Sequence, residues 1–457
     1  MNCIKYPSNS QETIKVQNKI TDFFNKFNIG TLMNRCGIKK HHGHSVRSLT
    51  EAIFILPFVG KNFFRGIVSN KDAPFGKDAA YDLLKGERFN WRNLLLCLAY
   101  RLFKVIDPLT GEDRESVFII DDSLYDRSRS KNVELLSRVY DHCTGRYMKG
   151  FRLLTMCWSD GVSTLPVDFS LLSSSKPKNR FCESRKQMDK RCCASKRRSE
   201  ATLKATDLLE PMVKRALSTG IRAKYLLMDS WFVMPAVVST LVNHIHVIGR
   251  VKKTNNVQYI FDAVPMNVNK IYRWLKNHRG ITKRMYEVVV TLKSGVPVKL
   301  VFVRNKNKSE CVVLLSTDTA LSGKDIVRIY GKRWDIEVFF KMSKQHLNLA
   351  KEIQFRDYDA LIAHTTIVFM RYMFLSYQCR METDHRTFGD LFYAYCDEIE
   401  DISFIESLYR LMTLAKDKLQ KAGVYCEKTA CAFFNTILDF ALKNFGLSKN
   451  NFNMSLV

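Results

Sequence analysis

The sequence predicts an α/β protein: a sheet with helices on its faces, interrupted by a β-rich insertion and flanked by helical segments. Three observations support this fold class. Short apolar runs typical of buried strands alternate with helical patterns between residues 113 and 250. Strand-like runs joined by turn residues fill 251–322. Helical periodicity dominates 1–112 and returns from residue 323 onward.

The N-terminal segment, 1–112, is expected to form a helical domain. Apolar residues recur at helical spacing in 14–27, 51–60 and 91–106. Ser48 or Thr50 is the expected N-cap of the second run and Asn90 that of the third, because their side chains can accept hydrogen bonds from the first helical turn.

Strands and helices in 113–250 follow a recognisable order. An apolar run, 117–120, leads into Asp121-Asp122, and a hairpin is predicted from 151–160 and 163–172. A helix over 199–217, a strand over 224–232 that contains Asp229, a further helix and a strand at 246–251 complete the series. This order of elements is the one expected of an RNase H-like sheet.

The remaining segments complete the domain plan. Residues 251–322 read as a β-meander inserted into the core. The core resumes over 323–380 with a helix that carries Glu337, and 381–457 reads as a helical C-terminal region. The most apolar stretch, 361–377, contains His364 and Arg371, so a buried helix is favoured over a membrane span.

Charge points to a polyanionic partner. The 457 residues contain 72 Lys and Arg against 45 Asp and Glu, a net charge of +27. Nucleic acid is the first candidate partner for a folded protein this basic, and an anionic membrane surface is the weaker alternative. The 13 cysteines form no CxxC pair, which argues against a zinc ribbon or a disulfide framework and favours a reducing cytoplasm. No signal peptide is evident at the start of the sequence.

The segment 176–204 concentrates this charge, with eleven Lys and Arg against three Asp and Glu. We expect it to contact the DNA backbone, although a merely solvated face is the alternative. The candidate contacts within it are Arg185, Lys186, Lys190, Arg191, Arg197 and Arg198.

The segment 329–347 carries the candidate chemistry. On a helix of about 100° per residue, one apolar cluster falls within an arc of about 40°: Ile329, Ile336, Phe340 and Leu347. A second face, about 60° wide, holds one carboxylate among polar and basic groups: Tyr330, Arg333, Glu337 and Lys344, with Lys341 beside them. The alternative reading is a surface helix in which Arg333 only pairs with Glu337 or Asp335.

The spacing Tyr330-x2-Arg333-x3-Glu337-x6-Lys344 resembles the YREK signature of bacterial insertion-sequence transposases, the group named after insertion sequence four. The resemblance covers about 115–380 and implies a DDE site. Asp121 with Ser123 resembles the family's Asp-x-Thr, Asp229 matches the second Asp, and Glu337 is the Glu of the signature. Asp122 is a rival for the first position.

Such a site implies that Asp121, Asp229 and Glu337 are catalytic and hold two Mg²⁺ or Mn²⁺ ions. Cutting a phosphodiester with two metals requires oxygen ligands that converge from separate elements. The basic and phenolic neighbours, Tyr330, Arg333, Lys341 and Lys344, are expected to contact DNA. No glycine-rich phosphate loop is present, so no nucleotide cofactor is implied.

The expected function is therefore transposition, in a cytoplasmic, nucleoid-associated bacterial protein. The enzyme would bind the terminal inverted repeats of its own element, cleave them and transfer the strand to target DNA, as a homodimer in a synaptic complex. The helical 1–112 segment resembles the end-binding domains of transposases. A structure-specific nuclease without strand transfer and a non-catalytic, domesticated DNA-binding protein are the alternatives. Trp231, Trp274 and Trp334 are expected to be packing residues rather than base-stacking ones.

Overall fold

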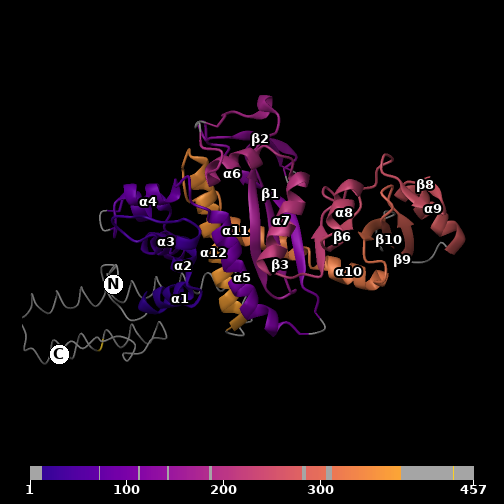
Figure 1. The fold of residues 1–457 in the computed structure, drawn as a ribbon, viewed down its shortest axis with the longest axis horizontal. Coiled ribbons are helices and arrows are strands. Elements are labelled where there is room, and N and C mark those ends of the chain that lie inside the picture. The colour runs from indigo at the N-terminus through magenta and orange to yellow at the C-terminus, as the bar shows by residue number, and fades with distance from the viewer. Residues whose placement is uncertain are drawn as a thin grey trace, which may run out of the picture.

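The computed structural model describes residues 13–381, apart from 71–72, 112–113, 142–143, 185–187, 280–284 and 305–310, and the single residue 436. The predicted helical C-terminal region therefore lies almost entirely outside the described residues, as do Arg185 and Lys186. N-terminal helices form one end of the molecule, a sheet with helices on its faces forms the middle, and the β-rich insertion forms the other end (Figure 1).

One sheet runs through the core and the insertion. Its order is β2-β3-β1-β5-β6-β11-β10-β9-β7-β8, and β4 also pairs with β3. The strands are β1 (Val117–Asp126), β2 (Ser137–Asp141), β3 (Arg146–Ser159), β4 (Thr164–Leu172), β5 (Tyr225–Met228), β6 (His246–Arg250), β7 (Tyr259–Phe261), β8 (Val264–Met266), β9 (Met285–Thr291), β10 (Pro297–Arg304) and β11 (Cys311–Ser316).

In the core, β3, β1, β5 and β6 lie side by side in that order. β1 is antiparallel to β3 and parallel to β5, and β5 is parallel to β6. This gives a large mixed sheet in an α/β protein, consistent with an RNase H-like core. The predicted meander is present as β9, β10 and β11, and it continues the core sheet because β11 pairs antiparallel with β6.

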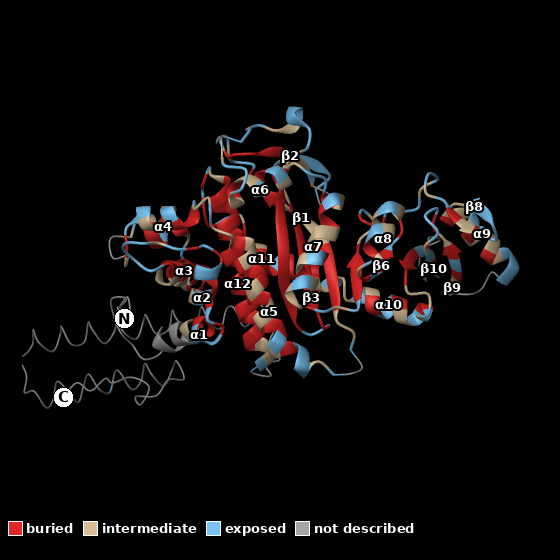
Figure 2. Cartoon of the chain, viewed as in Figure 1, coloured by how far each residue is buried: buried red, intermediate tan, exposed pale blue. Residues whose placement is uncertain are grey.

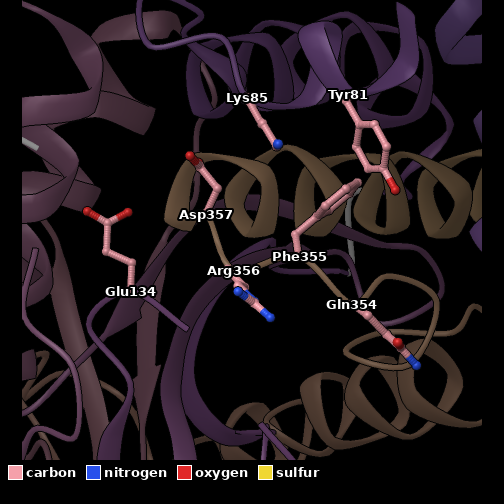
Figure 3. Close-up of a pocket in the computed structure, with 7 residues that line it drawn as sticks. All are labelled: Tyr81, Lys85, Glu134, Gln354, Phe355, Arg356 and Asp357. Atoms are coloured by element: carbon pink, nitrogen blue, oxygen red, sulfur yellow. The ribbon is translucent and has the colours of Figure 1, made fainter. Parts of the chain in front are cut away.

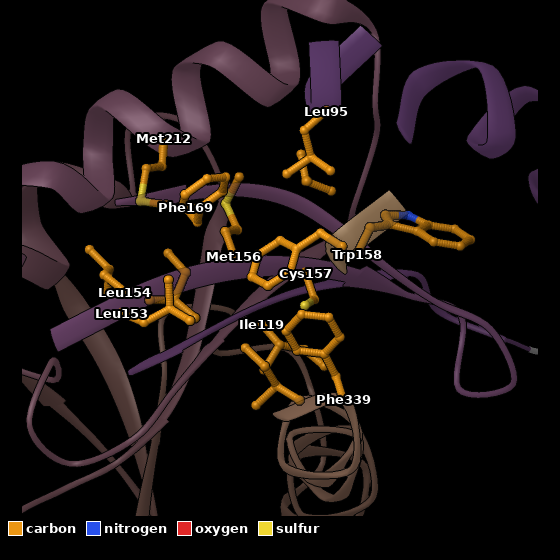
Figure 4. Packing of buried hydrophobic residues seen from close by; sticks show 14 of the residues in the cluster. Leu95, Ile119, Leu153, Leu154, Met156, Cys157, Trp158, Phe169, Met212 and Phe339 are labelled. Atoms are coloured by element: carbon orange, nitrogen blue, oxygen red, sulfur yellow. The ribbon is translucent and has the colours of Figure 1, made fainter. Parts of the chain in front are cut away.

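Helices cover both faces of the core sheet. α5 (Trp91–Ile106) and α7 (Ala205–Thr219) lie on one face and α11 (Trp334–Gln345) on the other. In Figure 4, Leu95 and Met212 approach the strands from one side, while Phe339 meets Ile119 and Cys157 from the opposite side. The other α-helices are α1 (Thr13–Lys26), α2 (Ile29–Arg35), α3 (Val46–Phe54), α4 (Lys77–Leu84), α6 (Cys193–Ala201), α8 (Pro235–Leu241), α9 (Val268–Arg279), α10 (Gly323–Gly331) and α12 (Tyr358–Met381).

Two predicted helices are each divided into two. The predicted helix over 199–217 is replaced by α6 and α7, which are separated at 202–204. The predicted helix over 329–347 is replaced by α10 and α11, with a turn at Lys332 and Arg333 directly after Gly331. Glycine weakens a helix interior because its backbone is more flexible, so a break at this point is physically reasonable.

Other element ends also differ from the predictions: β5 ends at Met228 and not at residue 232, and β3 begins at Arg146 and not at residue 151. β1 does not stop at Ile120 but continues through Asp126, because its partner β3 pairs with it over that whole length. Ser45, rather than Ser48 or Thr50, caps α3, its hydroxyl accepting a hydrogen bond from the Ser48 amide at 3.1 Å. Asn90 caps α5 as predicted, accepting from the Asn93 amide at 3.2 Å.

α12 is the predicted buried helix, and it joins the N-terminal helices to the core. Almost all of its 24 residues are buried, and it contacts α3, α4, α5, α11 and β4 (Figure 2). No helix among the described residues combines the length and the apolarity needed to cross a membrane.

A buried charge network anchors α12. Both carboxylate oxygens of Glu352 accept hydrogen bonds from Arg371, at 2.7 and 2.9 Å. Arg371 also donates to the carbonyl oxygens of Ile53 and Phe54 on α3, at 2.6 and 2.9 Å. His364 Nε2 lies 2.8 Å from the same Glu352 carboxylate. Through these contacts the network ties α3, α12 and the segment between α11 and α12 together, although the buried Nδ1 of His364 has no hydrogen-bond partner among the described residues.

We predict that Arg371→Ala lowers the free energy of unfolding by about 3–5 kcal/mol, because it leaves the Glu352 carboxylate buried without its cation. Chemical denaturation followed by circular dichroism measures this loss. Arg328→Ala is the matched control: Arg328 pairs with Glu115 at the surface, at 2.7 Å, and an exposed pair contributes about 0–1 kcal/mol. Equal losses in the two variants would contradict the anchoring role of Arg371.

Candidate active site

Asp121 and Asp229 lie at adjoining positions on neighbouring strands. β1 and β5 are parallel, and their register places Ile120 beside Met228. The residue after Ile120 is Asp121 and the residue after Met228 is Asp229, so the two aspartates adjoin at the carboxyl end of β5. The negative charge of Asp229 is one of the influences that raise the pKa of Asp121. The pairing of two strands thus brings together residues far apart in the sequence.

Glu337 reaches the same place from α11. This helix packs against the core through buried side chains that include Ile336 and Phe339, and Glu337 lies between them in the sequence, half-buried. Arg333, at the turn before α11, donates to Asp121 Oδ2 at 3.1 Å and to Glu337 Oε1 at 2.5 Å. The Arg333 guanidinium therefore contacts two of the three predicted acids, Asp121 and Glu337. The third, Asp229, adjoins Asp121 on the neighbouring strand.

The pKa of Asp121 is raised to about 7, mainly because burial disfavours the charged carboxylate. The charges of Asp122 and Asp229 raise it further. The Asp122 amide, which donates to Asp121 Oδ1 at 2.8 Å, and the Arg333 guanidinium act in the opposite direction. The site thus concentrates negative charge that Arg333 only partly compensates.

The other residues of the 329–347 segment also border β1, although they occupy two helices. The Arg333 guanidinium carbon lies 5.9 Å from the centre of the Tyr330 ring, and burial raises the pKa of Tyr330 to about 12. Lys344 Nζ donates to Ser123 Oγ at 2.6 Å, two residues beyond Asp121 on β1. Lys341 is exposed on α11. The turn between the helices therefore does not separate Tyr330 and Lys344 from the acids.

The two rival acids, Asp121 and Asp122, point to opposite faces of the sheet, since side chains alternate along a strand. Asp122 is held in a two-pronged ion pair by Arg152, whose Nε and Nη2 lie 2.5 and 2.6 Å from its carboxylate oxygens. Asp121, by contrast, lies on the face covered by α11. The geometry therefore groups Asp121, and not Asp122, with Glu337.

The structure corrects part of the DNA-contact prediction for the basic segment 176–204. Arg197 and Arg198 were predicted to contact DNA, but only 5% and 6% of their surfaces are exposed. Arg197 Nε donates to Asp359 Oδ1 at 3.1 Å, and Arg198 donates to both oxygens of Glu134 at 2.7 Å. These guanidinium groups neutralise buried acids inside the fold, so the structure contradicts a DNA-contact role for them. Lys190 and Arg191 are exposed, and Arg191 pairs with Asp189 at 2.9 Å.

Two contacts were missed by sequence reasoning. The alternative prediction paired Arg333 with Glu337 or Asp335. Arg333 does pair with Glu337, but its second partner is Asp121. Asp335 instead accepts a hydrogen bond from Ser159 at 2.6 Å. Arg152 was not singled out at all. Identifying it would have required the register of the β1–β3 pair, which a hairpin pattern alone does not specify.

The donor chemistry suits a divalent metal. Asp121 and Asp229 supply oxygen ligands at adjoining positions, and a cation there would relieve the repulsion that raises the Asp121 pKa. Yet the described side chains, as they stand, include no group of three His, Cys, Asp or Glu placed to hold a metal. Arg333 holds one oxygen of the Glu337 carboxylate, Oε1.

A cavity of about 410 Å³ lies away from these acids, between α4 and the segment that precedes α12. Figure 3 shows Lys85 pointing toward Asp357 across it, with Tyr81 and Phe355 on one side. None of the predicted site residues lines this cavity.

Two family models match the chain. Residues 64–281 match a model described as DDE superfamily endonuclease, and 193–374 match a model described as Transposase DDE domain. The first range contains Asp121 and Asp229, the second contains Asp229 and Glu337, and the two overlap. No curated protein matches the chain.

We predict that Asp121→Asn stabilises the protein more at high pH than at low pH, measured by thermal unfolding in EDTA. The folded carboxyl has a pKa of about 7 against an ordinary 3.8, so ionising it costs the folded state free energy that the unfolded state does not lose. Wild-type stability should therefore decline as pH rises through this window, and the advantage of the variant should grow by about 2 kcal/mol between about pH 5 and pH 8.

The matched control is Asp126→Asn, since Asp126 lies on the same strand but is exposed. It should show no such trend. An advantage of Asp121→Asn that is the same at both pH values would show that the Asp121 carboxyl is not held in its protonated form by the fold.

Proposed function

We propose that this chain, which contains a catalytic domain of the DDE transposase/endonuclease family, is an insertion-sequence transposase of the YREK group. DDE transposases act on DNA by phosphoryl transfer. In our proposal, this protein cleaves DNA at the ends of its own element and joins the freed 3′-hydroxyl to target DNA. The observation that supports the proposal is the adjoining position of Asp121 and Asp229 on paired strands, with Arg333 between Asp121 and Glu337.

DDE enzymes use divalent metal ions, and Asp121, Asp229 and Glu337 are the residues that would hold two Mg²⁺ or Mn²⁺ ions here. Bound ions would activate the attacking hydroxyl and stabilise the leaving oxygen at the scissile phosphate. The chain's own contribution is to set carboxylates from β1 and the β5 end at adjoining positions and to link one of them through Arg333 to Glu337 on α11.

Arg333 has a second role in this proposal. Its guanidinium fork matches phosphate oxygens as well as it matches carboxylates. When DNA enters, Arg333 would exchange its contacts with Asp121 and Glu337 for the phosphate next to the cleavage point. That exchange frees Glu337 as a ligand. Tyr330 would support the guanidinium, and Lys341 and Lys344 would add positive charge along the strand.

The DNA partners in this proposal are the terminal inverted repeats and the target, held in the bacterial cytoplasm by a homodimer that brings two ends together. The N-terminal domain, 1–112, would bind the ends, and the exposed Lys190 and Arg191 would contact the backbone. A nuclease without strand transfer is the second candidate, favoured by the endonuclease description of the model that matches 64–281.

We predict that Asp121→Ala, Asp229→Ala and Glu337→Ala each abolish cleavage of the DNA that flanks the gene, while binding of that DNA is retained. Each variant removes an oxygen ligand, whereas binding depends mainly on positive surface charge. Gel shift and cleavage assays in Mg²⁺ measure the two properties on the same DNA. Asp122→Ala should remain active, because Asp122 lies on the other face of β1.

Any variant of the three that still nicks DNA appreciably would remove that residue from the catalytic set. An inactive Asp122→Ala beside an active Asp121→Ala would reverse the assignment of the first acid. A wild-type protein that cuts the ends but gives no strand-transfer product would favour the nuclease candidate.

We predict that Arg333→Ala weakens both end binding and cleavage, and that Arg333→Lys stays impaired because a lysine keeps the charge but loses the two-pronged grip. Glu337→Gln, as the comparison, should bind normally and fail to cut. Gel shift beside cleavage of a pre-nicked end separates the two effects. If Arg333→Ala binds and cuts like wild type, its pairing with Asp121 and Glu337 serves the fold alone.

A further inference from the structure

Two cysteines on separate helices lie together where the N-terminal helices meet the core. Cys36 caps the C-terminal end of α2, and Cys97 lies within α5, which packs on the core sheet. α2 and α5 contact each other (Figure 1). Both thiols are free, with Cys36 buried and Cys97 half-buried. α3 and α4 lie between the two cysteines in the sequence, so the fold is what brings them together.

Cys36 is held against the first turns of α5. The Asn90 amide donates to the Cys36 carbonyl oxygen at 3.0 Å, and Asn93 Nδ2 donates to the Cys36 sulfur at 3.4 Å. Cys97 lies one helical turn beyond Asn93, and residues four apart on a helix are neighbours on one face. The two thiols are therefore adjacent, and they share a hydrogen bond.

Their surroundings make the two thiols chemically unequal. The hydrogen bond with Cys36 lowers the pKa of Cys97, burial opposes this effect, and the charges of Arg101 and Arg35 lower the pKa further. The same hydrogen bond raises the pKa of Cys36, and so does burial. A thiolate is the nucleophile in thiol–disulfide exchange, whereas a buried, protonated thiol is inert. Cys97 is thus suited to attack first, and Cys36 to react second.

A third cysteine, Cys193, is the rival partner for Cys36. It lies at the start of α6, and its charge also raises the pKa of Cys36. That influence is the smallest of those acting on Cys36, and it involves no hydrogen bond. Among the described thiols around Cys36, Cys97 is therefore the closer partner.

We propose that Cys36 and Cys97 are an oxidation site, which a small-molecule disulfide converts into a disulfide bridge between α2 and α5. The Cys97 thiolate attacks one sulfur of the small molecule and expels the other half as a thiolate, leaving a mixed disulfide on Cys97. The expelled thiolate takes the proton of Cys36, which then attacks the Cys97 sulfur and releases the second half. The protein is oxidised by two electrons, and the small disulfide is reduced to its two thiol halves.

Such a bridge would fix the N-terminal helices to the core. It closes a loop that contains α3 and α4, and cross-linking a loop stabilises the folded state because it restricts the unfolded chain. Neither cysteine belongs to the proposed catalytic acids, so the site adds a response to oxidation that the proposed reaction does not require.

The test incubates the full-length protein with oxidised glutathione, beside a sample kept in reduced glutathione. Remaining thiols are blocked with N-ethylmaleimide, and the protein is digested with trypsin without reduction. Cleavage after Lys and Arg releases Cys36 in peptide 36–39 and Cys97 in peptide 93–101, each as its only cysteine. Mass spectrometry should find the two peptides joined in the oxidised sample and separate in the reduced one. Cys157, which is buried in β3, should stay unmodified in both.

Serine variants separate the two roles. Cys36→Ser should retain glutathione on Cys97, because no neighbouring thiol displaces it; Cys36→Ala serves instead if the buried hydroxyl unfolds the protein. Cys97→Ser should leave Cys36 unmodified, because that thiol is buried and protonated. Cys193→Ser is the matched control and should form the same bridge as wild type. Thermal unfolding checks that each variant is folded, and oxidation should raise the unfolding temperature only where the bridge forms.

Several outcomes would overturn the site. Peptides 36–39 and 93–101 that stay separate in oxidised wild type would do so, as would a bridge from Cys36 to Cys193. Glutathione on Cys36 in the Cys97→Ser variant, with none on Cys97 in the Cys36→Ser variant, would reverse the order of attack. An oxidised wild type that unfolds at a lower temperature than the reduced protein would show that α2 and α5 must move apart to form the bridge, against the contacts that place the two thiols together.

Discussion

The parallel pairing of β1 with β5 is the constraint on which the site depends. It sets Asp121 beside Asp229, and the same sheet buries Asp121 deeply enough to bring its pKa to about 7. Two carboxylates so placed repel each other, and the fold retains them because Arg333 supplies positive charge from the turn before α11. The position of α11 therefore follows from two demands at once: its apolar face must cover β1, and its N-terminal end must deliver a cation to the strand.

Arginine has two distinct jobs in this protein. Arg371, Arg197 and Arg198 are buried and neutralise internal acids that hold α12 to α3, α6 and the core. Arg152 and Arg333 lie at the boundary between core and solvent, each gripping an acid of the Asp121-Asp122 pair. Part of the chain's large positive charge thus neutralises acids within the fold, and only the exposed remainder faces solvent.

The two faces of β1 each carry one acid that is paired with an arginine. On one face, Arg333 links Asp121 to Glu337; on the other, Arg152 holds Asp122.

Local pattern in the sequence determined most of the elements and the identity of the candidate acids. Apolar runs located β1, β5 and α12, the Asn90 cap located the start of α5, and spacing singled out Glu337 with its neighbours, because these features depend on residues close together in the chain. Only the tertiary structure decided which aspartate of the Asp121-Asp122 pair faces α11, since strand register and face come from the pairing partners. It alone showed that Arg197 and Arg198 are buried, because a basic run looks the same whether its charges meet solvent or the acids of distant segments such as Glu134 and Asp359.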